Sequence, residues 1–200
     1  MLSFFPTFDV GTTLLKDFSV GGSSNPFNLV SLGDGKGIFT IFNGADFSLG
    51  ITDGTTAGTQ LFKNIATGVA SSNPDSFKKL TTGEVLFSAY SYDGGQELWK
   101  TDGTAAGTVR IKDIDLTTVS ANPSALLALG NGQFVFTADN GVNGRELWVT
   151  DGTAANTQLV KDIKLGLEQS SDIEKLASLG NGKAVFLADD GVNGQELWIT

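Results

Sequence analysis

The chain has 200 residues, of which 40% are hydrophobic and 18% charged, and its formal net charge is −9. This length and apolar content can bury a core of ordinary domain size, whereas the negative charge argues against nucleic acid as a partner. The lack of Cys and His excludes disulfides, thiol nucleophiles, Cys/His zinc sites and His-based triads, and no apolar run approaches the roughly 20 residues of a membrane span.

A repeat organises the chain from its beginning to its end. The tripeptide Thr-Asp-Gly starts at Thr52, Thr101 and Thr150, so that successive copies are 49 residues apart. A Trp precedes this register by two positions at Trp99, Trp148 and Trp198. A second marker, Lys-Asp-Ile or a relative, keeps the same register: Lys16, Lys63, Lys112 and Lys161. Two markers in one register indicate a tandem array.

The unit from Asn122 to Ile163 shows the internal plan of the repeat. Its β-prone segments alternate with Gly/Asn/Asp turns, which supply positive φ angles. In chain order the expected strands are 125–129, 133–138, 145–150 and 157–163. No apolar period of 3.6 residues lasts long enough to predict a helix of normal length. Four short antiparallel strands in about 49 residues are typical of one β-propeller blade.

The sequence therefore predicts an all-β fold, a β-propeller of four-stranded antiparallel blades, as a single domain over residues 1–200. The expected blades cover approximately 19–65, 66–114, 115–163 and 164–200. Two arrangements are open for the last blade, which shows only three strands. Thr13–Phe18 resembles a fourth strand and can complete that blade, closing a ring of four. Alternatively, the chain is part of a larger ring.

The Trp and Glu residues of the repeat are expected to hold blades together. The spacing around Trp148 and Trp198 resembles the tryptophan-docking motif of quinoprotein propellers, in which an indole stacks against the neighbouring blade. A large ring once per blade can cover the apolar seam while its N–H finds a backbone acceptor. The Glu residues lie two positions before each Trp and share its strand face: Glu97, Glu146 and Glu196. We expect them to accept backbone or Lys hydrogen bonds between blades.

The Asp residues of the Thr-Asp-Gly-Thr turns are expected to lock those turns through Asx hydrogen bonds, with metal binding as the alternative. They are Asp53, Asp102 and Asp151. Their position between the third and fourth strands loosely resembles the Asp-box hairpins of sialidase-like propellers. The Trp of that box does not follow the turn here, so the likeness is architectural.

As a whole, the pattern E-L-W-x-T-D-G-T-x-x-G-T-x-L-V-K-D-I resembles the ELWxxDGT repeats of large bacterial secreted or surface proteins. Glu146–Ile163 departs from it only at Asn156, whereas the first unit has Gly50 in place of Trp and Ser48 in place of Glu. The resemblance implies the propeller architecture and an extracellular or cell-surface location. The first residues, Met-Leu-Ser-Phe-Phe-Pro, lack the basic region and cleavage site of a signal peptide.

The variable loops, rather than the repeated residues, are the candidate binding sites. They lie between one blade and the next, at 19–26, 66–74, 115–123 and 164–172, and share a face with the hairpins between strands two and three. Those hairpins add carboxylates at Asp93, Asp139, Asp189 and Asp190. No cofactor is expected, although such a rim can hold Ca²⁺; the alternative is that these Asp residues serve as solvated turn residues.

Two classes of function remain. The first is a non-enzymatic binding or structural module of an exported protein, engaging a protein or glycan through the loops, with other domains of a longer chain as further partners. The second is an enzyme, either a carboxylate-based glycosidase or lyase or a fragment of a quinone-dependent propeller enzyme. The sequence shows no Gly-rich phosphate cradle, G-x-S-x-G elbow or unique carboxylate pair, which favours the first.

Overall fold

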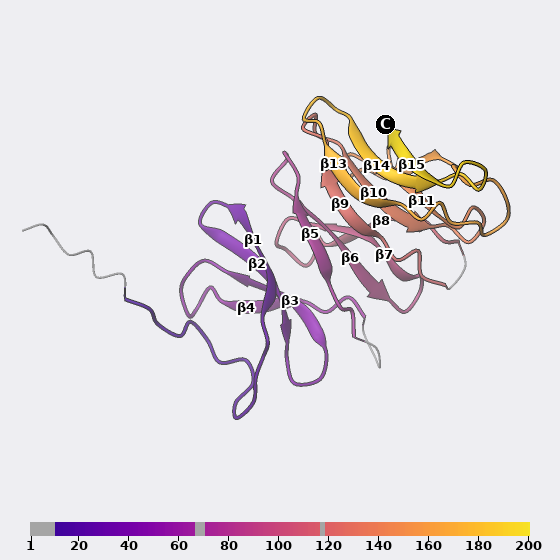
Figure 1. The fold of residues 1–200 in the computed structure, drawn as a ribbon. Coiled ribbons are helices and arrows are strands. Elements are labelled where there is room, and N and C mark those ends of the chain that lie inside the picture. Colours follow the sequence, from indigo (N-terminus) through magenta and orange to yellow (C-terminus); the bar gives the residue numbers. More distant parts are fainter. Residues whose placement is uncertain (1–10, 67–70, 117–118) are drawn as a thin grey trace, which may run out of the picture.

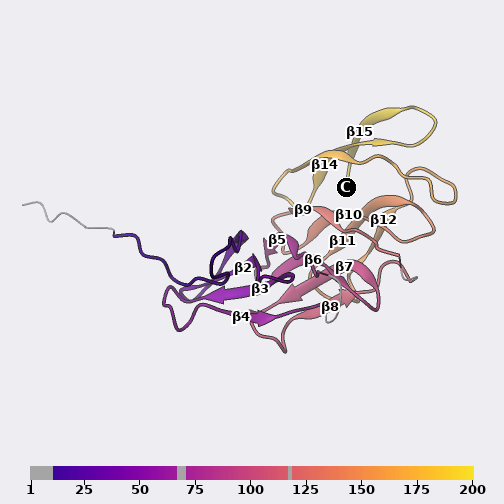
Figure 2. The ribbon, with the colours of Figure 1, turned by 90° about the horizontal axis from the view of Figure 1, so that it is seen from below.

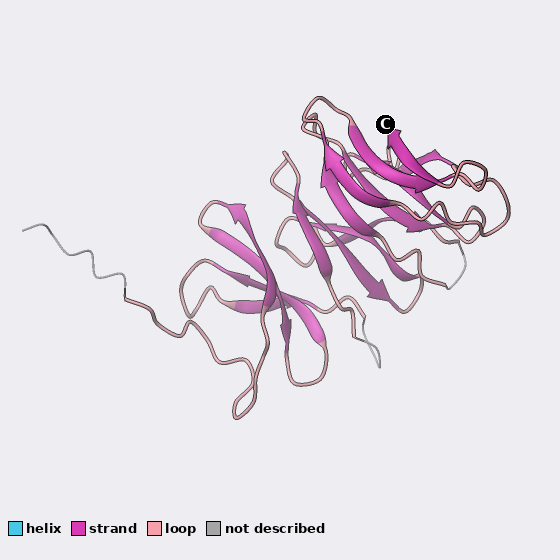
Figure 3. Cartoon of the chain, in the orientation of Figure 1, coloured by secondary structure: helices cyan, strands magenta, loops and turns pink. Residues whose placement is uncertain are grey.

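The structure, a computed structural model, describes residues 11–66, 71–116 and 119–200, and its regular structure there is entirely β (Figure 3). The described strands form four antiparallel sheets in chain order (Figure 1). Their bounds are β1 Phe27–Gly33, β2 Lys36–Phe42, β3 Phe47–Thr52, β4 Gln60–Lys63; β5 Asp75–Lys79, β6 Val85–Ser91, β7 Gly95–Thr101, β8 Val109–Lys112; β9 Ser124–Ala128, β10 Phe134–Asp139, β11 Arg145–Thr150, β12 Gln158–Lys161; β13 Glu174–Ser178, β14 Ala184–Asp189, β15 Gln195–Ile199. The predicted all-β fold of four-stranded units is confirmed, with three strands described in the last sheet.

Each inner sheet is buried on both faces, which explains its nearly continuous apolar strands. Along β10, Phe134 and Phe136 pack in one cluster with Leu86 and Leu98 of the preceding sheet. Val135 points the other way and packs in a second cluster with residues of the following sheet. Because successive side chains of a strand point to opposite faces, one strand serves two seams. The sheets therefore stack as successive blades.

The first strand of every sheet lies on the inner side of the arc. β1 contacts β5, β5 contacts β9, and β9 contacts β13. All four strands have a positive φ near their beginning, at Asn28, Ser76, Ala125 and Lys175. The pairing of each with its second strand also breaks register, as a β-bulge does. Bulges increase local twist, and these recur once per blade along the inner line of contact.

No helix that could span a membrane occurs in the described part of the chain.

Residues 13–18 do not complete the last sheet, contrary to one of the two predicted arrangements. They form no strand and lie against the first sheet, where Lys16 Nζ donates to the Thr59 carbonyl at 3.0 Å and the Phe18 ring meets Phe39 edge-on. Figures 1 and 2 both place this indigo segment at the opposite end of the molecule from the yellow last sheet. In this structure the segment therefore lies against the first sheet, beside Phe39 and Thr59.

Candidate functional site

The Trp side chains of the repeat lie in the seams between sheets. Trp148 is only 5% exposed and packs in a cluster that contains Leu98, Ile111 and Ile114 of the preceding sheet. Trp99 packs with Leu49 and Phe62 of the first sheet in the same way. Trp198 packs with residues of the third sheet, and Lys161 Nζ lies 5.1 Å from its ring centroid. The indole thus contacts the blade before its own.

The indole N–H groups behave differently from the sequence expectation. Trp198 Nε1 donates to the carbonyl of Ala188 at 3.1 Å, which is in its own sheet. Trp99 Nε1 and Trp148 Nε1 are buried and have no hydrogen-bond partner among the described residues. The role of these rings in the two inner seams is therefore packing, and the hydrogen bond is not a constant part of the motif.

The first sheet fills the missing Trp position from its neighbouring strand. Gly50 pairs directly with Phe39, and the Phe39 ring occupies the space that a side chain at Gly50 would take. Phe39 is 7% exposed. An aromatic ring therefore remains in the seam position, supplied by β2 instead of β3.

Glu97 fastens the loop between the second and third blades to β7. Its side chain is completely buried, and its two carboxylate oxygens accept the backbone N–H groups of Ile114, at 2.9 Å, and Ala121, at 3.2 Å. Burial raises the pKa of Glu97 to about 7, because desolvation of the charged form outweighs these hydrogen bonds. Glu97 therefore holds both ends of one crossover.

Glu146 does the same for the next crossover with one change. It is also completely buried, and it accepts the backbone N–H of Ile163 and, at 2.7 Å, the hydroxyl of Ser171. Burial raises its pKa, while the Ser171 hydrogen bond acts in the opposite direction. Glu196 differs from both because it is exposed.

The Asp residues of the Thr-Asp-Gly-Thr turns lock the turns internally. Asp102 Oδ1 accepts both the backbone N–H and the hydroxyl of Thr104, at 2.9 and 2.7 Å, which lowers its pKa. Two Thr hydroxyls, those of Thr101 and Thr108, meet at 2.8 Å across the base of the hairpin. Asp53 and Asp151 make the same pair of bonds with the Thr two positions later, and these bonds likewise lower their pKa values.

The Gly of each turn makes the close contact with the preceding blade. A side chain at Gly103 would collide with Leu32 of the first sheet, and one at Gly152 would collide with Leu80 of the second. Both residues have φ angles near +90°, a conformation that Gly adopts without steric cost. Gly54 has no preceding sheet and no atom within 4 Å of the corresponding position.

The third repeat departs from the motif at Asn156, and a hydrogen bond from the Asn156 side chain compensates for the change. Asn156 stands where Gly58 and Gly107 stand in the other turns, and its side chain donates to Asp151 Oδ2 at 2.6 Å. An ideal Cβ at Gly107 would overlap the Asp102 carboxylate, so any side chain there must move that carboxylate and replace its contacts.

Gly107→Asn is therefore expected to change the free energy of unfolding by less than about 1 kcal/mol, because Asn can donate to Asp102 as Asn156 does to Asp151. Gly107→Leu, which moves the carboxylate without offering a donor, should cost about 1–3 kcal/mol. Urea unfolding followed by circular dichroism measures both. Equal costs for the two variants would contradict the compensation.

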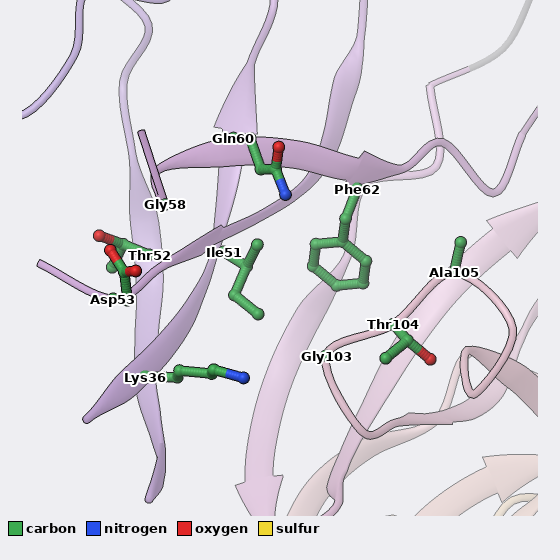
Figure 4. Close-up of a pocket in the computed structure, with 10 residues that line it drawn as sticks. All are labelled: Lys36, Ile51, Thr52, Asp53, Gly58, Gln60, Phe62, Gly103, Thr104 and Ala105. Atoms are coloured by element: carbon green, nitrogen blue, oxygen red, sulfur yellow. The ribbon is translucent and has the colours of Figure 1, made fainter. Parts of the chain in front are cut away.

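A groove of about 420 Å³ runs between the first two sheets beside these turns. Figure 4 shows the Lys36 ammonium, Ile51 and the Phe62 ring on one side and the turn containing Gly103 and Thr104 on the other. The one carboxylate of its lining, Asp53, already accepts bonds from Thr55. This groove thus places no second carboxylate opposite Asp53 for acid–base chemistry.

The opposite end of the blades carries the loop face, which we define as the crossovers between blades and the hairpins between strands two and three. Hydrogen bonds join the two kinds of loop: Asn143 Nδ2 donates to Asp162 Oδ2 at 2.7 Å, and the Glu168 N–H donates to the Val142 carbonyl at 2.9 Å. In Figure 1 the orange and yellow loops at the right of the last two sheets belong to this face. Residues 67–70 and 117–118 of two crossovers lie outside the described residues.

The sequence analysis missed a pair of small residues, a Ser followed by Ser or Ala, at the end of the three later crossovers. Ser71, Ser120 and Ser170 each accept, through the hydroxyl, a backbone N–H at the start of the third strand of the preceding sheet. The next position is fully buried in the three later crossovers: Ser72, Ala121 and Ser171. The recurring Ser-x-Asn-Pro before β1, β5 and β9 was the available signal.

The carboxylates proposed for a metal site are engaged by groups of their own hairpins or of the neighbouring crossover. Asp139 Oδ1 accepts the Gly141 N–H, and Asp190 accepts N–H groups of Val192 and Asn193. Asp189 pairs with Lys164 Nζ at 3.0 Å. The Gly191 N–H, which donates to Asp189 Oδ1 at 2.7 Å, lowers the pKa of Asp189, and the N–H groups of Asn193 and Val192 lower that of Asp190. In the described residues no three His, Cys, Asp or Glu side chains are grouped to hold a metal.

Several of the exposed large apolar side chains lie on the loop face. At the hairpin tips Tyr92, Val142 and Val192 are between 55% and 86% exposed. The crossovers add Val20, Leu116, Val119, Leu165 and Leu167. Large exposed apolar side chains that collect on one surface are typical of interaction sites. The loop face thus carries apolar as well as acidic side chains. The buried Glu97 and Glu146 accept hydrogen bonds from the crossovers beneath it.

No protein-family model matches the chain, and no curated protein matches its sequence. Among solved structures, it is similar to a puromycin hydrolase mutant complexed with PGG, with a TM-score of 0.53 and 12% identity over 87% of this chain and 26% of that one. A second puromycin hydrolase structure gives a TM-score of 0.50 and 12% identity over 81% and 24%. An endo-arabinase from Bacteroides thetaiotaomicron VPI-5482 gives 0.36, with 12% identity over 92% and 75%, too low to support an argument.

The chain spans about a quarter of the length of the puromycin hydrolase structures. At 12% identity the likeness concerns the fold alone. Together with the stacked four-stranded sheets, it shows that the chain has a β-propeller fold.

Proposed function

We propose that the chain is a non-enzymatic binding module of an exported bacterial protein, which contacts its ligand through the loop face. The proposal rests on one observation: the repeated residues make structural contacts, and the exposed residues of the loop face do not repeat. The repeated Trp, Glu and Asp side chains of the inner blades serve seams, crossovers and turns, whereas the loop face presents exposed, non-repeated side chains on rigid supports.

The chemistry of the loop face favours a protein ligand over a glycan. Its exposed positions include large aliphatic side chains, with Leu165 and Leu167 each at least 80% exposed. Protein interfaces have an apolar core, enriched in aromatic residues, inside a polar rim. The acidic hairpins around this cluster further favour a partner with basic residues at its rim.

A displayed peptide library provides the probe for this proposal. Peptides selected on the native chain should be enriched in apolar and basic residues and lose at least roughly tenfold in affinity toward a variant carrying Val142→Ser, Leu165→Ser and Leu167→Ser. The matched control is Val109→Ser, which changes an exposed residue of the outer strand β8. If the peptides bind the loop-face variant with the same affinity as the native chain, the ligand does not bind at the loop face and the proposal is contradicted.

The enzymatic alternative predicts turnover instead. A carboxylate-based glycosidase would release nitrophenol from aryl glycosides, and a quinone-dependent enzyme would reduce a dye after addition of quinone and Ca²⁺. We expect neither, because Glu97 and Glu146 lie completely buried and bonded to backbone groups. Activity that Glu97→Gln or Glu146→Gln abolishes in a folded protein would reverse this conclusion.

A further inference from the structure

We infer that the groove between the first two sheets binds a small carboxylate, whose apolar body packs against Ile51 and Phe62 and whose charge is met by the Lys36 ammonium group. The groove has a volume of about 420 Å³, within the range of roughly 300–1,000 Å³ that is usual for small-molecule sites. Its two walls are β3 and β4 of the first sheet and the Gly103 turn of the second. It lies at the end of the blades opposite the loop face, so the inference does not depend on the proposed function.

The strand pairing of the first sheet places the apolar wall of the groove on one face. Ile51 pairs directly with Ile38 and with Gln60, and Phe62 follows Gln60 by two positions. These side chains therefore share the face toward the second sheet. The opposing turn comes close because it carries Gly103, where a Cβ would lie 3.1 Å from Ile51. Ile51 and Phe62 are only partly buried, so the groove leaves apolar surface accessible to a ligand.

Lys36 brings a cation to this wall that forms no ion pair with a described residue. Figure 4 shows its ammonium group on one side of Ile51 and the Gln60 amide on the other. Asp53, the one carboxylate of the lining, accepts the N–H and hydroxyl of Thr55 at 2.9 and 2.7 Å. These two bonds chiefly lower the pKa of Asp53, and the charge of Lys36 contributes least to that shift. Lys36 is therefore not committed to Asp53.

The second seam has its charges paired at the same positions of the repeat. By the register of the sheets, Glu84 holds the position of Lys36. Lys100 likewise holds the position of Ile51, and its Nζ lies 2.9 Å from Glu84 Oε1. That wall is neutral and polar, whereas the first seam combines an unpaired cation with an apolar wall. The first groove is thus complementary in charge and polarity to a carboxylate with an apolar body.

The number of donors favours a carboxylate over a phosphate. Lys36 is the one cation among the described residues that line the groove, and it balances a single negative charge. The Gln60 amide offers a second, neutral donor on the same wall. A phosphate monoester carries a charge of about −2 at neutral pH, and its excess charge would lie in a groove that already contains Asp53. A singly charged carboxylate avoids that repulsion.

Amide NMR of the isotope-labelled chain tests the site with small probes of known charge. Benzoate, phenylacetate and cyclohexanecarboxylate are titrated, each beside its neutral amide as the control of matched shape. At least one carboxylate should shift the backbone resonances of Gln60, Gly103 and Thr104 with a Kd on the order of 1 mM, as expected for about ten non-hydrogen atoms. Its amide should bind roughly tenfold more weakly. No shift with any carboxylate at concentrations about tenfold above that Kd, or equal binding of the amides, would overturn the inference.

Variants of the groove locate the binding. Lys36→Gln should weaken carboxylate binding roughly tenfold, whereas Lys183→Gln, which removes the same charge at the same position of the repeat in the fourth sheet, should leave it unchanged. The double variant Lys36→Glu with Ile51→Lys builds the ion pair of the second seam into the first. It should bind no carboxylate, and a cooperative thermal transition shows that it folds. Binding that survives in the groove variants, or that Lys183→Gln weakens equally, would show that the anions bind elsewhere and would refute the site.

Discussion

Trp148→Ala is expected to lower the free energy of unfolding by about 3–5 kcal/mol, because it empties a ring-sized space in the seam between the second and third sheets. The ring is 5% exposed and shares its cluster with side chains of both sheets. Its N–H makes no hydrogen bond to any described residue, so lost packing accounts for the effect. Urea unfolding followed by circular dichroism measures the change.

Trp198→Ala provides the control at the same position of the repeat. Trp198 is only partly buried and belongs to the last sheet, whose outer face is open. Its loss should cost less than about half as much, even though it includes the hydrogen bond to Ala188. A larger cost for Trp198 than for Trp148 would show that hydrogen bonding, not seam packing, is the purpose of the motif.

The stability of the chain should fall as pH rises through 7, and Glu97 should supply a large part of that fall. Its pKa is raised from 4.5 to about 7 by burial, so the stability linked to its protonated form is fully present below about pH 4.5 and is lost as pH rises through 7. At about 1.4 kcal/mol per pKa unit, the difference is about 3 kcal/mol.

Glu97→Gln should remove that contribution, because Gln stays neutral. The variant should lose about 3 kcal/mol less than the native chain between pH 4.5 and 8 in urea unfolding. Glu84→Gln is the control, since Glu84 is a partly exposed partner of Lys100 at 2.9 Å, and its effect should be below about 1 kcal/mol. An identical pH profile for native and Glu97→Gln chains would mean that Glu97 titrates at its ordinary pKa.

The same carboxylate links stability to the proposed binding function. Glu97 and Glu146 anchor crossovers that carry exposed apolar residues of the loop face. A binding surface made of loops gains affinity when its loops are held in one conformation before binding. The buried Glu residues thereby hold the crossovers of the loop face in place, as the Trp residues hold neighbouring sheets together.

The sequence by itself determined the blade and its strands. For the unit 122–163 the expected strands 133–138 and 145–150 correspond to β10 (Phe134–Asp139) and β11 (Arg145–Thr150). This was possible because alternation, turn residues and the period of the repeat are local signals. The turn chemistry of Asp102 is also local, since its partner Thr104 is two residues away.

What only the tertiary structure decided depends on contacts between units. The Phe39 ring at Gly50, the donors to Glu97 more than 15 residues away in the chain, and the position of Thr13–Phe18 on the first sheet are not encoded in any local pattern. The sequence of residues 13–18 is compatible with the outer strand of more than one blade, because the outer strands β4, β8 and β12 are similar and all end in Lys. Only the tertiary contacts, Lys16 with the Thr59 carbonyl and Phe18 with Phe39, place them on the first sheet.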